Sequence, residues 1–175
     1  MIQFRPKNTP KTSLLSILSL FLLISGISLL SACSKSDNKN TTTACTIKAQ
    51  YVNDSSATQR AQMIAFCNNN GIVYTVHPSG ILYQIVAPGD TTKPDLCTSI
   101  TMTYKGKFMT GIQFDAGTIT EPLKNLIKGW QIAVPMIGKG GKIKMVIPSS
   151  LAYGDKGAPP SIPANVPLYF EMSID

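Results

Sequence analysis

The side chains best suited to chemistry in this chain are aromatic and hydroxyl groups set among glycines and prolines. The only tryptophan, Trp130, follows a glycine inside an apolar segment, and Tyr153 lies in a loop rich in Gly and Pro. His77 is the only histidine, and no Cys-x-x-Cys or Cys/His cluster occurs. This composition argues against a zinc site, a thiol redox centre or a histidine-based triad.

Three segments, in order, resemble the FKBP-type peptidyl-prolyl cis-trans isomerases. Lys128–Tyr153 reads KGWQIAVPMIGKGGKIKMVIPSSLAY, and Ile100–Asp115 reads ITMTYKGKFMTGIQFD upstream of it. Gly154–Ile174 carries APPSIPANVPLYFEMSI. The resemblance covers roughly residues 80–175. It implies an α+β fold, in which a curved antiparallel β-sheet wraps around one short helix with the active cleft between them.

The resemblance also implies an enzyme that needs no nucleophile, metal or cofactor. Rotation about an X-Pro amide must cross a barrier of about 18–20 kcal/mol, because it destroys the resonance of the amide. A pocket that strips water from the carbonyl and fits the twisted amide favours the transition state over the planar ground state. An aromatic cradle with one or two hydrogen-bond donors is sufficient for this chemistry.

The family's pocket can be carried over onto nine positions of this chain. Trp130 matches the floor beneath the proline ring, Tyr153 matches a hydroxyl donor, and the backbone N–H of Ile127 matches the donor to a ligand carbonyl. The predicted catalytic residues are Tyr104, Phe114, Asp115, Trp130, Tyr153 and Phe170, and the predicted substrate-binding residues are Leu126, Ile127 and Ile162. The competing interpretation is that these aromatic residues are ordinary members of the core.

One segment departs from the family pattern. Only eleven residues, Ala116–Leu126, separate Asp115 from Ile127. This segment lacks an additional aromatic wall residue and a basic partner for the aspartate, and Ile119 is the candidate replacement for the aromatic residue. The departure leaves catalytic efficiency and macrolide inhibitor binding open. A non-catalytic, FKBP-like peptide-binding chaperone or adaptor is therefore the alternative to an isomerase acting on proline-containing polypeptide clients.

The first 32 residues resemble a bacterial lipoprotein signal peptide. Arg5, Lys7 and Lys11 form a basic start, Leu14–Leu30 is an apolar run, and Leu-Ser-Ala-Cys ends at Cys33. We expect cleavage before Cys33 and acylation of its thiol, which predicts a lipid anchor in the cell envelope, at the outer membrane and facing the periplasm. An uncleaved transmembrane anchor is the alternative, because the apolar run is about as long as a short span.

Cleavage would remove three basic residues and lower the formal net charge from +7 to +4. The remaining lysines are spread over the chain without interleaved aromatic residues and arginines, so we expect a solvated surface and no nucleic-acid partner. Residues 33–44 are polar and predict a flexible tether. Among the three further cysteines, Cys45–Cys97 is the preferred disulfide and Cys67 a buried thiol, although the other pairings stay open.

Residues 45–79 predict a small N-terminal extension with one helix, and residues 80–175 the isomerase domain. Strict alternation in the core strands predicts antiparallel strands packed on one side only. We expect a monomer, with a dimer formed through the extension helix as the alternative. The expected elements are a helix over Ser56–Asn69, strands over Ile72–Val76, Ile81–Ala87, Ser99–Tyr104, Lys142–Ile147 and Leu168–Ile174, and a helix within Gly129–Ile137.

Overall fold

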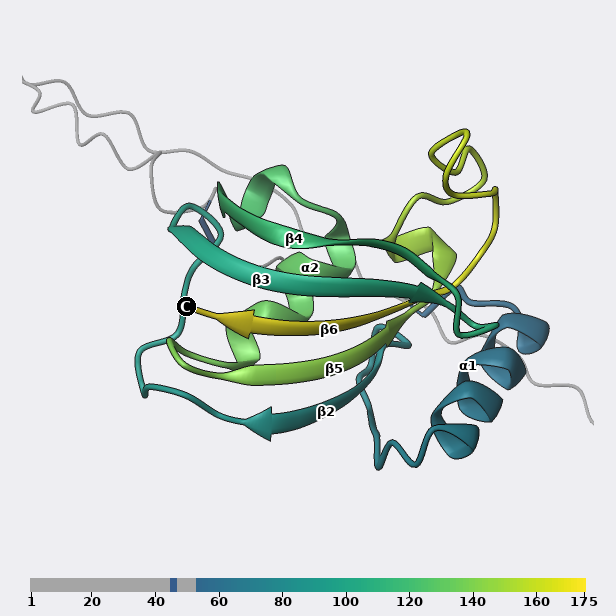
Figure 1. The fold of residues 1–175 in the computed structure, drawn as a ribbon, viewed down its shortest axis with the longest axis horizontal. Helices are drawn as coiled ribbons and strands as arrows, with labels where there is room; N and C mark the ends of the chain where they lie inside the picture. Colours follow the sequence, from purple (N-terminus) through teal and green to yellow (C-terminus); the bar gives the residue numbers. More distant parts are fainter. Residues whose placement is uncertain (1–44, 47–52) are drawn as a thin grey trace, which may run out of the picture. The chain divides into compact units, whose positions relative to one another are not determined.

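Six antiparallel strands form one sheet, in the order β1-β2-β5-β6-β3-β4 (Figure 1). The computed structural model describes residues 45–46 and 53–175. The predicted signal peptide and the whole of the predicted tether, including Cys33, lie outside this part of the chain. The elements are α1 (Ala57–Asn69), β1 (Thr75–Val76), β2 (Leu82–Ala87), β3 (Ser99–Phe108), β4 (Gln113–Pro122), η1 (Leu123–Asn125), α2 (Lys128–Ala133), η2 (Val134–Met136), β5 (Lys142–Ile147), η3 (Ser149–Leu151) and β6 (Leu168–Ile174).

The inner face of the sheet carries the main core. Ile143, Met145 and Ile147 of β5 alternate along the strand and are each about 1% exposed or less. Helix α2 lies against this face, and Gly129 allows the close approach because a Cβ there would lie 2.5 Å from Ile147 Cγ2. The α+β fold with one short helix behind an antiparallel sheet is therefore confirmed (Figure 1).

The helix that covers the sheet begins earlier than the sequence suggested. Its first residue is Lys128, and the α-helical turns end at Ala133. Pro135 does not occupy its first turn, as a start near Ile132 would require, but lies in the following 3₁₀ turn η2. Proline lacks an N–H and is tolerated where the chain leaves the regular α-helical hydrogen-bond pattern.

The outer face of the sheet is partly covered as well, and the expectation of packing on one side only is wrong. Val146 and Tyr169, which point away from the main core, are 1% and 3% exposed. They pack in a second apolar cluster with Met63, Phe66 and Cys67 of α1. The apolar face of α1 thus buries Tyr169, which lies on the side of β6 opposite the main core.

The N-terminal extension folds largely as the sequence predicts. Ser56 caps α1 by accepting a hydrogen bond from the Gln59 N–H, at 3.2 Å. The helix ends at Asn69 with Asn70 as its C-cap, and Gly71 takes a positive φ of 63° that favours glycine. The next strand is shorter than expected, with only Thr75–Val76 paired to β2. His77 lies in the turn that follows, with Nδ1 2.8 Å from Ser79 Oγ.

Cys45 and Cys97 form a disulfide with a Cα–Cα distance of 5.1 Å, which is the pairing that the sequence analysis preferred. Cys67 is a buried free thiol. Within residues 45–46 and 53–175, no helix is both long and apolar enough to cross a bilayer.

Candidate functional site

A cavity of about 150 Å³ lies between α2 and the inner face of the sheet, at the β3–β4 edge. Its walls come from two strands of this edge, from β6, from the segment that enters α2, and from the loop after β5. The lining residues are Tyr104, Phe114, Asp115, Ile119, Leu126, Ile127, Trp130, Tyr153 and Phe170. Eight of the nine residues that the sequence assigned to a pocket are therefore brought together here, and Ile119 joins them.

Aromatic rings build the floor and walls of the cavity. Trp130 is 5% exposed, and its ring lies edge-on to Tyr104 at 5.1 Å and to Phe170 at 5.2 Å between centroids. Phe114 lies edge-on to Phe170 at 5.7 Å. Such edge contacts are a preferred arrangement of aromatic pairs. They hold the rings in fixed positions, so that the cavity is shaped before any ligand enters.

A glycine makes this ring packing possible. Gly106 lies inward on β3, opposite Asp115 of β4 and Phe170 of β6. A Cβ at Gly106 would lie 2.5 Å from Phe114 Cζ and 3.0 Å from Phe170 Cε1. Gly106 was not among the residues predicted from the sequence, although a glycine at an inward position of an alternating strand is a signal of close approach.

The polar groups of the site come from Tyr104, Asp115 and Tyr153. The Tyr104 hydroxyl donates a hydrogen bond to Asp115 Oδ2 at 2.7 Å. Burial, followed by this hydrogen bond, raises the pKa of Tyr104 to about 12. Burial and then the charge of Asp115 also raise the pKa of Tyr153. Both phenols therefore stay protonated and keep a donor at neutral pH.

Two donors facing this region are unpaired among the described residues. The Tyr153 hydroxyl makes no hydrogen bond there, and its side chain is 38% exposed. The N–H of Ile127 donates no hydrogen bond within the same residues, since Ile127 precedes α2 and only its carbonyl accepts from Trp130 and Gln131. Gln131 fixes the approach to the helix by donating to the Leu126 carbonyl at 2.8 Å. Both donors are therefore free to bind a ligand, which is the role that the family resemblance implied for them.

Ile162 is the assigned residue that the structure does not bring to the cavity. It is 5% exposed, packs with the main core and forms an isolated antiparallel bridge with Ala158. The loop folds back on itself here, which turns the Ile162 side chain inward. A role near the mouth of the cavity would have to act through the shape of this loop.

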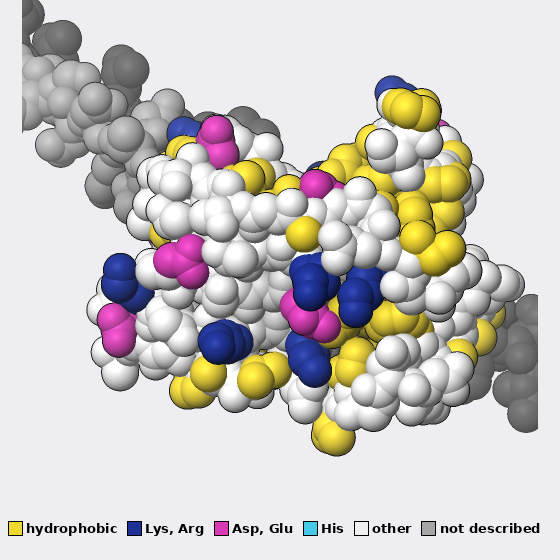
Figure 2. Space-filling model, viewed as in Figure 1, with side chains coloured by type: hydrophobic (Ala, Val, Ile, Leu, Met, Phe, Trp, Pro, Cys, Tyr) yellow, Lys and Arg dark blue, Asp and Glu magenta, His cyan; other side chains and the backbone are white. Residues whose placement is uncertain are grey.

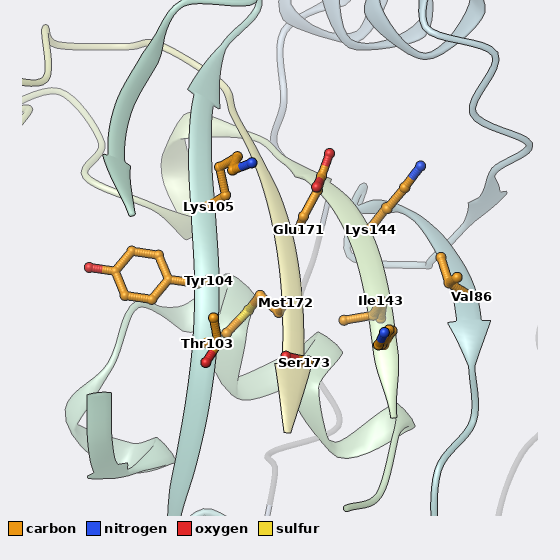
Figure 3. A pocket seen from close by; sticks show the side chains of 10 residues that line it. Val86, Thr103, Tyr104, Lys105, Ile143, Lys144, Glu171, Met172 and Ser173 are labelled. Atoms are coloured by element: carbon orange, nitrogen blue, oxygen red, sulfur yellow. The ribbon is translucent and has the colours of Figure 1, made fainter. Parts of the chain in front are cut away.

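A second, wider hollow of about 280 Å³ lies on the outer face of the sheet. Figure 3 shows Lys105 and Lys144 on either side of Glu171. Each lysine lies directly opposite Glu171 in the register of its strand with β6. Figure 2 shows the same face, with basic and acidic side chains interspersed. The hollow has one carboxylate among three lysines, and Tyr104 is its one aromatic lining residue. It resembles a solvated strand face with cross-strand charge pairs, not a binding pocket.

No group of three or more potential metal ligands occurs within the residues described. The side chains and backbone that line the cavity can bind a ligand, exclude water and donate hydrogen bonds.

Comparison with known proteins agrees with this geometry. Residues 90–175 match the family described as FKBP-type peptidyl-prolyl cis-trans isomerase. The chain is 40% identical over 101 residues to the FKBP-type peptidyl-prolyl cis-trans isomerase FkpA of Escherichia coli, covering 55% of this chain and 37% of that protein. It is 32% identical over 120 residues to the peptidyl-prolyl cis-trans isomerase Mip of Coxiella burnetii, covering 66% of this chain and 51% of that protein.

Solved structures give the same result. The peptidyl-prolyl cis-trans isomerase of Pseudomonas syringae has a TM-score of 0.55 and 31% identity, covering 69% of this chain and 96% of that one. The crystal structure of FkpA from Escherichia coli has a TM-score of 0.60 and 31% identity, covering 67% and 58%. The chain spans about a third to a half of the length of FkpA of Escherichia coli and Mip of Coxiella burnetii. By sequence and by fold, this chain belongs to the FKBP-type peptidyl-prolyl cis-trans isomerase family.

Proposed function

We propose that this protein accelerates rotation about X-Pro peptide bonds in polypeptide clients, with the cavity above Trp130 as its active site. The observation that carries the proposal is the pre-shaped aromatic cavity with two unpaired donors at its wall, Tyr153 Oη and the Ile127 N–H. A proline ring packed on the Trp130 indole would place the preceding amide among these groups.

The aromatic walls act first, by removing water from the amide. A planar amide carbonyl is well solvated, and the twisted amide carries less charge on its oxygen because resonance is lost. Moving the X-Pro bond into an apolar cavity therefore destabilises the planar form more than the twisted form. Trp130, Phe114 and Phe170 supply this environment, and their mutual edge contacts prevent the cavity from collapsing.

The hydrogen-bond donors then orient the substrate. The Ile127 N–H and the Tyr153 hydroxyl can each bind a substrate carbonyl next to the proline, which holds the flanking chain while the bond between them rotates. Asp115 already accepts from Tyr104, at 2.7 Å. This bond fixes the Tyr104 ring as a wall and keeps the carboxylate at the rim of the cavity.

The proposal is tested by measuring isomerisation of an Ala-Leu-Pro-Phe-type peptide by NMR exchange with the purified full chain. We expect acceleration at micromolar enzyme and its loss when rapamycin is added. Absence of acceleration by a folded protein would refute the enzymatic function. Acceleration that rapamycin does not inhibit would retain the isomerase and remove macrolide binding.

A non-catalytic binding protein is the second candidate, and Ile119 motivates it. This side chain lines the cavity at a wall where the sequence pattern led us to expect an aromatic residue. A smaller wall could still bind a prolyl segment while fitting the twisted amide less closely. Binding of an unfolded client by a folded protein that shows no peptide isomerisation would favour this candidate.

We further propose that the domain works at the bacterial cell envelope, as a monomer held by a lipid on Cys33. The basic start, the apolar run and the Leu-Ser-Ala-Cys site support the anchor. Mass spectrometry of membrane-extracted protein should find acylated Cys33 at the N-terminus, and an intact Met1 would refute cleavage. Cys33→Ser should release the protein from membranes, since each buried CH₂ of an acyl chain contributes about 0.8 kcal/mol.

A further inference from the structure

The loop between β5 and β6 carries Tyr153, and its two ends meet at one side chain of the N-terminal extension. Gln59 Nε2 donates to Ser149 Oγ at 2.7 Å and to the carbonyl of Asn165 at 3.1 Å. Gln59 Oε1 accepts from the Ser149 N–H at 3.2 Å. Ser149 begins this loop and Asn165 lies near its end, so one amide group bridges about sixteen residues of chain.

The position of Gln59 follows from the packing of α1. Gln59, Met63 and Phe66 are spaced at i, i+4 and i+7, which places them on the same face of the helix. Met63 and Phe66 are buried against the outer face of the sheet, 1% and 5% exposed. The apolar contact therefore aims Gln59, in the first turn, at the loop. Figure 1 shows α1 and this loop at the same end of the sheet.

The amide orientation is set by its partners. The Ser149 N–H can only donate, so the side-chain atom facing it must be the Gln59 oxygen. The carbonyl of Asn165 can only accept, so the atom facing it must be the nitrogen. Ser149 is 5% exposed, and its hydroxyl has Gln59 as its partner. A second contact from the extension, between Asp54 and Ser150, lies beside the first.

Contacts inside the loop connect this bridge to the site. The carbonyl of Ser149 accepts from the N–H groups of Ala152 and Gly154, at 2.9 Å and 2.8 Å. These two residues flank Tyr153. At the other end, the Asn165 N–H donates to the Gly154 carbonyl at 2.8 Å. The backbone on both sides of Tyr153 is thus hydrogen-bonded to the two residues that Gln59 holds.

We propose that Gln59 is a positioning residue for the isomerase site: it holds the two ends of the Ser149–Asn165 loop together and so fixes the Tyr153 hydroxyl at the cavity. The inference rests on the proposed function. It makes the N-terminal extension part of the active enzyme, although Gln59 lies outside residues 90–175, which match the family.

The test is a double-mutant cycle in the full chain, with Gln59→Ala, Tyr153→Phe and the double variant. Gln59→Ala should lower kcat/KM by about two- to tenfold and no more than Tyr153→Phe does, because it acts through the one hydrogen bond of the Tyr153 hydroxyl to the substrate. If Gln59 acts through the Tyr153 hydroxyl, the same change in the Tyr153→Phe background should have less than about a twofold effect. Equal effects in both backgrounds would overturn the inference, because a general loss of stability is additive.

A matched control and a second readout complete the design. Gln62→Ala removes the same side chain from the same helix, and within the described residues Gln62 makes no side-chain hydrogen bond. It should leave kcat/KM unchanged. Hydrogen–deuterium exchange of the Ala152 and Gly154 amides should rise in Gln59→Ala and not in the control, whether or not the parent protein is an isomerase. Unchanged exchange would refute the bridge, whereas an inactive parent would refute only the proposed function.

If Gln59→Ala does not fold, Gln59→Glu supports the same comparisons. A carboxylate can still accept from the N–H and the hydroxyl of Ser149, but it cannot donate to the Asn165 carbonyl. We expect a smaller loss of kcat/KM than for alanine and faster exchange of the Asn165 amide, whose N–H donates to the Gly154 carbonyl. Full activity with unchanged exchange would contradict the role of the Asn165 contact.

Discussion

Trp130 and Tyr153 should both be needed for activity, but only Trp130 should be needed for folding. Trp130 is 5% exposed and contacts the rings of Tyr104 and Phe170. Its Nε1 is the one buried side-chain polar atom without a hydrogen-bond partner in the described part of the chain. Trp130→Ala therefore breaks no hydrogen bond, and its whole effect comes from lost packing and the remaining cavity. Substitutions of this kind lower the free energy of unfolding by about 3–5 kcal/mol.

Tyr153→Phe should behave in the opposite way. The hydroxyl has no partner among the described residues, so its removal leaves the folded protein with the same intramolecular hydrogen bonds. We expect the free energy of unfolding to change by less than about 0.5 kcal/mol. The substrate would lose one hydrogen bond, which is worth about 0.5–1.5 kcal/mol and corresponds to a two- to tenfold drop in kcat/KM.

Urea unfolding and NMR exchange of a prolyl peptide, done on the same preparations, separate the two effects. Trp130→Phe is the matched control, because it keeps an aromatic floor and should lie between the parent and Trp130→Ala in both measurements. The assignment of the cavity is refuted if Tyr153→Phe unfolds the protein. It is equally refuted if Trp130→Ala stays folded and retains full activity.

Four further outcomes follow from the same contacts. Gly106→Ala should lower both stability and activity, measured by urea unfolding and peptide exchange, because its Cβ would meet Phe114 at 2.5 Å. Replacing both Cys45 and Cys97 by serine should lower the free energy of unfolding by about 3–4 kcal/mol, the value expected for a loop of about 50 residues, with reduction of the parent as control. Cys67 should resist iodoacetamide in the native protein and react after unfolding, because burial raises the pKa of its thiol to about 11. Folding raises the pKa of the Tyr104 hydroxyl from 10.0 to about 12. Its contribution to the free energy of unfolding should therefore be complete below pH 10 and lost towards pH 12, as measured by urea unfolding at a series of pH values.

Several elements could be predicted from the sequence because their causes are local. Ser56 caps α1 and Gly71 follows its end, as their side chains and conformational preferences require. The alternation in β5 and β6 identified the inner face, since side chains of a strand point alternately to its two sides. The helix α2 was expected in the right segment, but its first residue was not, because Pro135 is equally compatible with a first turn or with a 3₁₀ turn.

The second apolar cluster could not be predicted in the same way. Tyr169 occupies a polar-looking position on β6, and its burial depends on α1, which is about one hundred residues away in the chain. The same holds for Gln59, which is an ordinary helix residue until the Ser149–Asn165 loop is brought to it. The apolar spacing in α1 does not tell which distant segment it packs against, so only the folded chain reveals these contacts.

The sequence by itself determined the fold class, the family resemblance and eight of the nine pocket positions that it proposed. It could do so because short motifs of this chain occur in the same order as those of the FKBP-type family, and the pocket positions were carried over from that resemblance. The tertiary structure decided the rest: that Ile119 completes the cavity, that Ile162 turns into the core, and that Gly106 lets Phe114 and Phe170 meet. These features depend on distances between side chains from different strands and loops, which packing sets only when the whole sheet, α1 and α2 are in place.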